Sequence, residues 1–311
     1  MNTKDLHQQL ADYLDYKLAL NFSPATCDST RRNCRAFFRW LAAHCEVTTS
    51  DRLRKEQLER WQKHMAAHQT KKGTPLKAKS INKSVECVRD FLKYLVFHGH
   101  VPQTLLDALQ YVKEPKTLPG SVLTHAEVRK LLRRMDTTTP EGHRDRAMLE
   151  LLYSSGIRVG ELLGLDVEDI NLAHAAATVT GKGKKDRVVP IGRTALRYVE
   201  SYIVAVRPFL MVERTERALF LHRGKRVRYQ RLLRTIHAAA ARVGIDKQVS
   251  PHTFRRSCTT ELIRSGANMY HVKELLGHES LATLKHYAKL TILDLKETHA
   301  KCHPREREDR R

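Results

Sequence analysis

The chain has 311 residues, which is long for a single domain, so two domains are expected, each able to bury a core. A hydrophobic share of 41% with 29% charged residues excludes a disordered chain, and no apolar run of about 18 residues predicts a membrane span. Because 56 Lys and Arg stand against 34 Asp and Glu, the formal net charge is +22, and a polyanion is the expected partner.

The six cysteines are scattered without a CxxC pair. They predict reduced thiols in a reducing compartment, and neither a disulfide framework nor a zinc site. The first residues, MNTKDLHQQL, lack the apolar core of a secretion signal. We therefore expect a cytoplasmic protein that needs no metal and no cofactor.

Residues 1–112 predict a basic module of helices. Leu6, Leu10 and Leu14 recur at helical spacing, and Ser23 followed by Pro24 predicts an N-cap and a first helical residue. Ser80 is expected to cap a later helix that stops at Gly99. The basic residues on the polar faces of these helices are Arg31, Arg32, Arg35, Arg39, Lys79 and Lys83. They suit contacts with DNA phosphates, although a solvated helix face explains each one equally well.

Residues 113–123 contain two prolines and a glycine and predict a linker between domains. Thr124 is expected to cap the first helix of a second domain that runs to residue 300, before a charged tail over 301–311. Two short apolar runs flank the tip GKGKKD and predict an antiparallel hairpin, with a third strand in ALFLH and a possible fourth in RVRYQ.

Two stretches of this domain place charged side chains at the starts of helices. Arg158 and Glu161 lie three residues apart in GIRVGELLGL, so Glu161 can orient the guanidinium, although an ordinary surface ion pair is the alternative. Ser250 and Pro251 begin a helix with His252 and Arg255 in its first turns, where an anion is favoured. The alternative for His252 is a buried core histidine.

The stretch KELLGHESLATLKHYAKL predicts a helix ending at Gly277, a short turn, and a second helix capped by Ser280. A helix-turn-helix has the same pattern. However, the second helix begins with Glu279, Ser280 and Leu281, which are poorly equipped for base contacts. Tyr287 lies at the edge of its apolar stripe.

The motifs GIRVGELLGL, GKGKKDRVVPI, SPHTFRRS, LLGH and HYAKL, in this order, resemble the catalytic domain of the tyrosine recombinases, the phage integrase and Xer-like family. The helical module and the linker resemble the core-binding region of the same family, so the resemblance covers residues from about 3 to 300. It implies a mainly α fold with a small antiparallel β-sheet, in which a core-binding domain (1–112) and a mixed α+β catalytic domain (124–300) form a C-shaped DNA clamp.

The resemblance also implies site residues. Arg158 and Arg255 match the two catalytic arginines, Glu161 matches the supporting acidic position, and His252 matches the histidine of the HxxR pair. Arg256 stands where family members usually have histidine.

The remaining catalytic positions follow from the same resemblance. Lys182 matches the lysine of the hairpin tip, although Lys184 and Lys185 are its neighbours there. His278 matches the histidine of the LGH motif, and Tyr287, nine residues later, matches the nucleophile.

These matches imply a site-specific recombinase that cuts and rejoins duplex DNA through a 3′-phosphotyrosine, acting as a tetramer on DNA and as a monomer or dimer when free. A type IB topoisomerase-like enzyme and a non-catalytic helix-turn-helix regulator are the alternatives. The carboxylates Asp166, Glu168 and Asp169 suggest a metal nuclease, but a solvated turn before a strand is the preferred interpretation.

Overall fold

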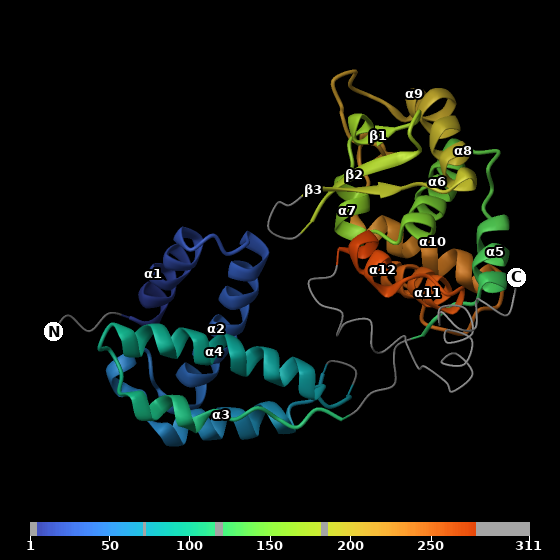
Figure 1. The fold of residues 1–311 in the computed structure, drawn as a ribbon. Coiled ribbons are helices and arrows are strands. Elements are labelled where there is room, and N and C mark those ends of the chain that lie inside the picture. Colours follow the sequence, from blue (N-terminus) through green and yellow to red (C-terminus); the bar gives the residue numbers. More distant parts are fainter. Residues whose placement is uncertain (1–4, 71–72, 116–120, 182–185, 278–311) are drawn as a thin grey trace, which may run out of the picture. The chain divides into compact units, whose positions relative to one another are not determined.

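The computed structural model describes residues 5–70, 73–115, 121–181 and 186–277. The chain divides into two compact units, Met1–Thr117 and Leu118–Arg311 (Figure 1). Within the described ranges, no helix combines the length and the apolar character that crossing a bilayer requires.

The first unit is built from helices. Its elements are α1 (Leu6–Ala19), α2 (Pro24–Cys45), η1 (Ser50–Arg52), α3 (Lys55–Ala67), α4 (Ala78–Phe97) and η2 (Gln103–Ala108). The predicted N-cap at Ser23 is confirmed, because its side chain accepts a hydrogen bond from the Thr26 backbone N–H with Pro24 as the first helical residue. The predicted cap at Ser80 is wrong. α4 begins at Ala78 after Lys77, since its first turn uses backbone bonds to the Lys77 carbonyl in place of a side-chain cap.

An aromatic core joins these helices. Phe37 of α2 and Phe91 of α4 are fully buried, and Trp61 of α3 lies with its ring centroid 4.8 Å from that of Phe37. Both tryptophans of the chain, Trp40 and Trp61, belong to this unit. Tryptophan fluorescence therefore reports the first unit alone.

The second unit has helices around a small sheet. Its helices are α5 (His125–Arg133), α6 (Pro140–Ser155), α7 (Val159–Gly164), η3 (Val167–Asp169), α8 (Arg193–Ser201), η4 (Tyr202–Val206), α9 (Arg207–Leu210), α10 (Tyr229–Arg242), α11 (Pro251–Arg264) and α12 (Met269–Leu276). The predicted cap at Thr124 is confirmed, and it forms a capping box with Glu127. The chain just before it belongs to this unit as well, because the Leu123 backbone N–H donates to the Ser257 hydroxyl of α11 over 2.8 Å.

Helix α6 is the centre of the second unit, and every residue from Arg144 to Leu152 is buried. A charged side chain inside a core must be paired. The Arg144 guanidinium donates to Asp145 and to the Leu221 carbonyl, and Arg146 pairs with Glu150. The helix therefore packs on all sides without leaving these charges uncompensated.

The predicted hairpin is confirmed. β2 (Ala176–Thr180) pairs antiparallel with β3 (Asp186–Pro190), with Ala177 opposite Val189, and β1 (Ile170–Asn171) extends the sheet on the other side of β2. The third strand is confirmed in shortened form, since β4 (Leu221–His222) pairs only with β5 (Lys225–Arg226). The possible fourth strand over 226–230 is wrong beyond its first residue, because α10 begins at Tyr229.

Candidate active site

Arg158 is the N-cap residue of helix α7 and directly precedes its first residue, Val159. The Arg158 backbone N–H donates to Glu161 Oε2 over 2.7 Å, and Arg158 Nη1 donates to Glu161 Oε1 over 2.9 Å. The predicted orientation of Arg158 by Glu161 is thus present in the structure. The Glu161 side chain is only 4% exposed, so this contact is not an ordinary surface ion pair.

A second arginine, Arg187 of β3, lies on the other side of the same carboxylate. Arg187 Nη1 and Nη2 donate to Glu161 Oε1 and Oε2 over 2.7 and 2.9 Å. Sequence reasoning missed this residue. Its only signal was its place just after the lysine-rich tip of the hairpin, which does not distinguish it from a solvent-facing strand residue.

Arg255 of α11 is 7% exposed and bonds to two backbone carbonyls. Its Nη1 donates to Gly156 O and its Nη2 to Leu276 O, each over 2.7 Å. Gly156 has a φ of +61°, and a Cβ there would come within 2.8 Å of the Leu276 side chain. Only glycine suits this position, where the chain turns sharply between α6 and α7 and still presents its carbonyl to Arg255.

The three arginines meet at the C-terminal end of α12. Arg187 Nε donates to Leu275 O over 3.3 Å, Arg255 to Leu276 O, and Arg158 Nη2 to Gly277 O over 2.7 Å. The last carbonyls of a helix have no partner within the helix and carry partial negative charge. The end of α12 therefore collects guanidinium groups from α7, β3 and α11 in one place.

The electrostatics agree with this convergence. Burial alone would raise the pKa of Glu161, but the hydrogen bonds from Arg187 and Arg158 outweigh it and lower the pKa to about 2. Burial, and next the charge of Arg158, lower the pKa of Arg255 to about 10, so Arg255 stays protonated near neutral pH. Three guanidinium groups beside one carboxylate leave the site with a net positive charge, which suits an anionic ligand.

His252 lies in the first turn of α11 with its side chain exposed, so the interpretation as a buried core histidine is wrong. Partial desolvation, followed by the charges of Arg255, Arg256 and Arg158, lowers the pKa of His252. A neutral imidazole at physiological pH still has one N–H to donate. The neighbouring Arg256 is used differently, because its Nη2 donates to the Ser121 carbonyl over 3.0 Å.

Three of the predicted catalytic residues, Lys182, His278 and Tyr287, lie outside the described residues. Their sequence neighbours are described. β2 and β3 lead to the hairpin tip that contains Lys182, and α12 ends directly before His278.

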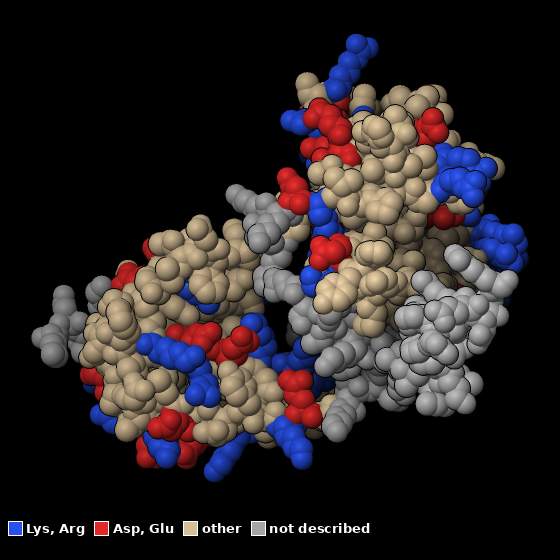
Figure 2. All heavy atoms as spheres, viewed as in Figure 1, with Lys and Arg blue, Asp and Glu red and all other residues tan. Residues whose placement is uncertain are grey.

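The residues predicted to contact DNA from the first unit lie on its surface. The side chains of Arg32, Arg35 and Lys79 are exposed, while Arg31 pairs with Asp28 and Lys83 pairs with Glu86 over 2.9 Å. Figure 2 shows Lys and Arg side chains on both units, interspersed with Asp and Glu. The Arg31 and Lys83 side chains are 40% and 50% exposed, so they remain accessible to phosphate despite these pairs.

The carboxylates that suggested a metal nuclease do not converge. Asp166 pairs with Arg226, Glu168 pairs with Arg217, and Asp169 accepts from the Asp166 backbone N–H. In the part of the chain that the structure describes, no group of three or more His, Cys, Asp or Glu could hold a metal ion.

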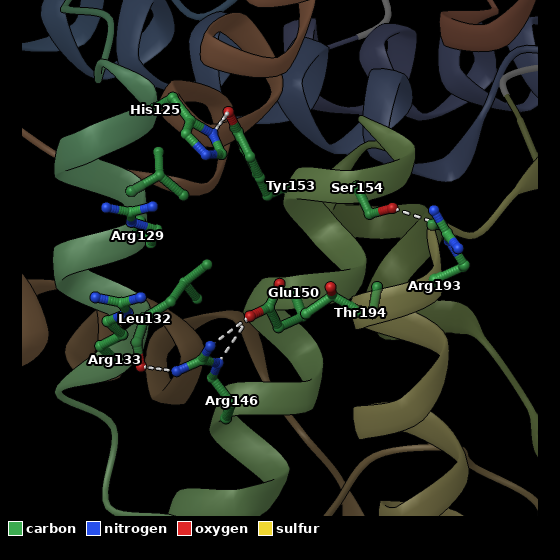
Figure 3. Close-up of a pocket in the computed structure, with 13 residues that line it drawn as sticks. His125, Arg129, Leu132, Arg133, Arg146, Glu150, Tyr153, Ser154, Arg193 and Thr194 are labelled. Atoms are coloured by element: carbon green, nitrogen blue, oxygen red, sulfur yellow. Dashed lines mark hydrogen bonds and ion pairs between the residues drawn. The ribbon is translucent and has the colours of Figure 1, made fainter.

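A separate pocket of about 550 Å³ lies between α5, α6 and the start of α8 (Figure 3). Val128, Leu132 and Ala195 form an apolar floor. Arg129, Arg133 and Arg193 stand around it with exposed side chains, and Arg146 pairs with Glu150 along one wall. The pocket shares no residue with the arginine cluster at the end of α12.

Known proteins match both the sequence and the fold. The Phage integrase family matches residues 121–292. The tyrosine recombinase XerD of Lacticaseibacillus casei is 32% identical over 302 residues, which cover 96% of this chain and 100% of that protein. The structure of the Tn1549 transposon integrase in complex with a circular intermediate DNA aligns with a TM-score of 0.74 at 16% identity, over 96% of this chain and 99% of that one. A lambda integrase tetramer bound to a Holliday junction aligns with a TM-score of 0.69 at 16% identity, over 93% of this chain and 78% of that one.

The fold is therefore that of the integrase-type recombinases, mainly helical with small antiparallel sheets, as the sequence predicted. The chain belongs to the phage integrase family of tyrosine recombinases. It is a site-specific recombinase, an enzyme that breaks and rejoins DNA, so the interpretations as a topoisomerase or a non-catalytic regulator are set aside.

Proposed function

We propose that Arg158, Arg255, His252, Lys182, His278 and Tyr287 form the active site, with Glu161 as the supporting residue. The observation that carries the proposal is the convergence of Arg158 and Arg255 on the last carbonyls of α12, directly before His278. Each of these two guanidinium groups uses two of its N–H groups: those of Arg158 donate to Glu161 and Gly277 O, and those of Arg255 donate to Gly156 O and Leu276 O. A guanidinium has five N–H groups, so donors remain for a phosphate.

The proposed reaction is attack by the Tyr287 phenol oxygen on a DNA phosphodiester. The bond from phosphorus to the tyrosine oxygen forms, the bond to the 5′-oxygen breaks, and a 3′-phosphotyrosine stores the energy for rejoining. Arg158 and Arg255 stabilise the charge that develops on the non-bridging oxygens. His252 adds a hydrogen bond to the same oxygens.

Two proton transfers complete the step. Lys182 gives its proton to the leaving 5′-oxygen as general acid. His278 accepts the proton of Tyr287 or positions its ring. A phenol has a pKa near 10 in water, and the positive charge of the arginine cluster favours the phenolate that attacks.

Residues 1–112 of the first unit serve in this proposal as the core-binding domain, joined by the linker 113–123 to the catalytic domain 124–300. The basic residues that contact DNA phosphates in this proposal are Arg31, Arg32, Arg35, Lys79 and Lys83. The net charge of +22 supports a DNA partner. The enzyme acts in the cytoplasm.

Recombination in this proposal takes place in a tetramer on DNA. The sequence over 290–300, LTILDLKETHA, combines apolar residues with Asp294 and Glu297. The pocket between α5, α6 and α8 offers the complementary surface, an apolar floor with arginines around it. We assign this pocket to segment 290–300 of a neighbouring protomer, a head-to-tail contact that can close into a ring.

The test of the chemistry is Tyr287→Phe on a nicked suicide substrate, from which a cleaved fragment escapes. The variant should bind DNA as the wild type does and form no covalent protein–DNA adduct. An adduct with the phenylalanine variant would assign the nucleophile elsewhere.

A further inference from the structure

The Glu161 carboxylate receives four donors, and they come equally from two arginines. Oε1 accepts from the side chains of Arg158 and Arg187, while Oε2 accepts from the Arg158 backbone and from Arg187 Nη2. An ionised carboxylate offers about four lone-pair sites. Arg187 therefore fills half of the capacity of the residue that orients Arg158.

This division limits how Arg158 meets Glu161. An arginine and a carboxylate left to themselves prefer a bidentate contact with two parallel hydrogen bonds. Here Arg187 makes that bidentate contact. The Arg158 side chain makes one hydrogen bond to Glu161, through Nη1, and its Nη2 donates to Gly277 O. Without Arg187, the carboxylate would be free to accept two parallel hydrogen bonds from the Arg158 guanidinium, which would leave fewer of its N–H groups for a phosphate.

Arg187 is itself fixed on a third side. Its Nε bonds to Leu275 O, and a Cβ on Gly277, which has a φ of +62°, would come within 3.0 Å of the Arg187 guanidinium. The side chain is 17% exposed. Arg187 thus joins β3, α7 and the end of α12 through one planar group, which a flexible lysine could not reproduce.

A role in stability alone does not explain this arrangement well. Compared with well-packed hydrophobic residues of the same volume, a buried ion pair usually adds little stability, because desolvating the charges offsets their attraction, although removing only one partner is costly. Hydrophobic residues would fill the same space at less cost. What the ion pair provides instead is geometry, because hydrogen bonds from both arginines hold the Glu161 carboxylate in a single position.

We propose that Arg187 is a positioning residue for DNA cleavage, which acts through Glu161 to keep one edge of the Arg158 guanidinium open for the scissile phosphate. The inference rests on the proposed role of Arg158. Arg187 does not touch the phosphate in this proposal, and its removal misplaces the residue that does.

The test compares Arg187→Met with Arg187→Lys, measuring covalent adduct formation on the nicked substrate. A small misplacement of a catalytic group lowers rates by about 100-fold, so Arg187→Met should cleave about 10- to 100-fold more slowly while binding a half-site within about 2-fold of the wild type. Arg187→Lys keeps the charge without the planar fork and should remain at least about 10-fold slow. A lysine variant as fast as the wild type would overturn the proposal, because charge alone would then suffice.

A matched control separates positioning from stability. Arg226 also bridges backbone carbonyls, those of Leu163 and Leu165, and a carboxylate, Asp166, in the same unit. Arg226→Met should lower the thermal midpoint by an amount similar to that of Arg187→Met and leave the cleavage rate of the folded protein unchanged. Equal cleavage defects in the two variants would show that Arg187 only stabilises the unit.

A modified substrate identifies the group through which Arg187 acts. When a methyl group replaces one non-bridging oxygen, the scissile phosphate is neutral and depends less on a guanidinium. The defects of Arg187→Met and Arg158→Met should both shrink on this substrate, to within about 3-fold of the wild type. An Arg187→Met defect of undiminished size would overturn the action through Arg158.

A double variant adds an independent check. Arg187→Met combined with Glu161→Gln should cleave no more slowly than the slower single variant, because both disturb one contact. A double variant whose loss of cleavage rate equals the product of the two single losses would contradict the proposed route through Glu161. Failure of the proposed function itself looks different, since the wild type would then form no adduct or Tyr287→Phe would retain it.

Discussion

Replacing Glu161 with glutamine keeps the shape of the side chain and removes its charge. In the wild type, this buried carboxylate accepts hydrogen bonds from both Arg158 and Arg187. The amide of glutamine has one acceptor oxygen and a donor group that would face the arginines. We expect the second unit to lose stability at neutral pH, with the loss depending on pH in a defined direction.

The pKa of Glu161 sets the magnitude. A carboxyl whose pKa falls from 4.5 to about 2 on folding stabilises the folded protein by about 3 kcal/mol at pH 7. The contribution is complete above the unfolded pKa and is lost as the pH falls through the folded value. At pH 3 roughly half of it remains, so the difference in the free energy of unfolding between wild type and Glu161→Gln should shrink by about 2 kcal/mol between pH 7 and pH 3.

Urea unfolding at the two pH values measures this difference. Far-UV circular dichroism follows both units, while tryptophan fluorescence follows only the first, because Trp40 and Trp61 both lie there. Other groups that titrate over this range do so in both proteins and cancel in the comparison. A difference that stays the same within about 0.5 kcal/mol would show that the charge of Glu161 does not stabilise the fold, and would refute the reasoning.

Three further predictions concern the backbone, the general acid and the assembly. Gly156→Ala should destabilise the second unit by roughly 2–4 kcal/mol, because the new Cβ is strained at positive φ and meets Leu276; a thermal midpoint like that of the wild type would contradict this. Lys182→Ala should cleave normal DNA slowly but recover when sulfur replaces the leaving 5′-oxygen, and equal defects on both substrates would assign Lys182 to phosphate binding. Truncation after Ala288 should preserve half-site binding and abolish cooperative binding of a full site, as should Arg133→Glu in the pocket; unchanged cooperativity would show that the segment and the pocket are dispensable.

Local sequence was sufficient for the features that local physics controls. Ser23 with Pro24, and Thr124, were predicted to start helices, and they do, because a cap is formed by residues within three or four positions of one another. The hairpin of β2 and β3 follows for the same reason, since its strands pair across a short tip. Ser80 failed as a cap because Lys77, three residues earlier, already ends the loop and begins the turn.

The sequence also determined which residues of the described site to examine, since Arg158, Glu161, His252 and Arg255 come from motifs read in order along the chain. What it could not supply is how they are held. Arg255 bonds to a carbonyl 99 positions before it in the chain, and Arg187 bonds to one 88 positions after it. Backbone carbonyls have no residue identity, so no pattern of side chains marks them as partners.

Tertiary structure alone decided the role of Arg187 and the surroundings of α6. A charged residue in a strand or helix predicts a solvent-facing position, yet Arg187 packs against Glu161 and Arg144 is fully buried. Arg144 has the Asp145 carboxylate beside it in the sequence, but its carbonyl partner is that of Leu221, 77 positions away. Arg187 pairs with Glu161, 26 positions before it. Local sequence thus determined the capped helices, the hairpin and the residues proposed to carry the chemistry, whereas the positions of the guanidinium groups depended on contacts that exist only once the chain has folded.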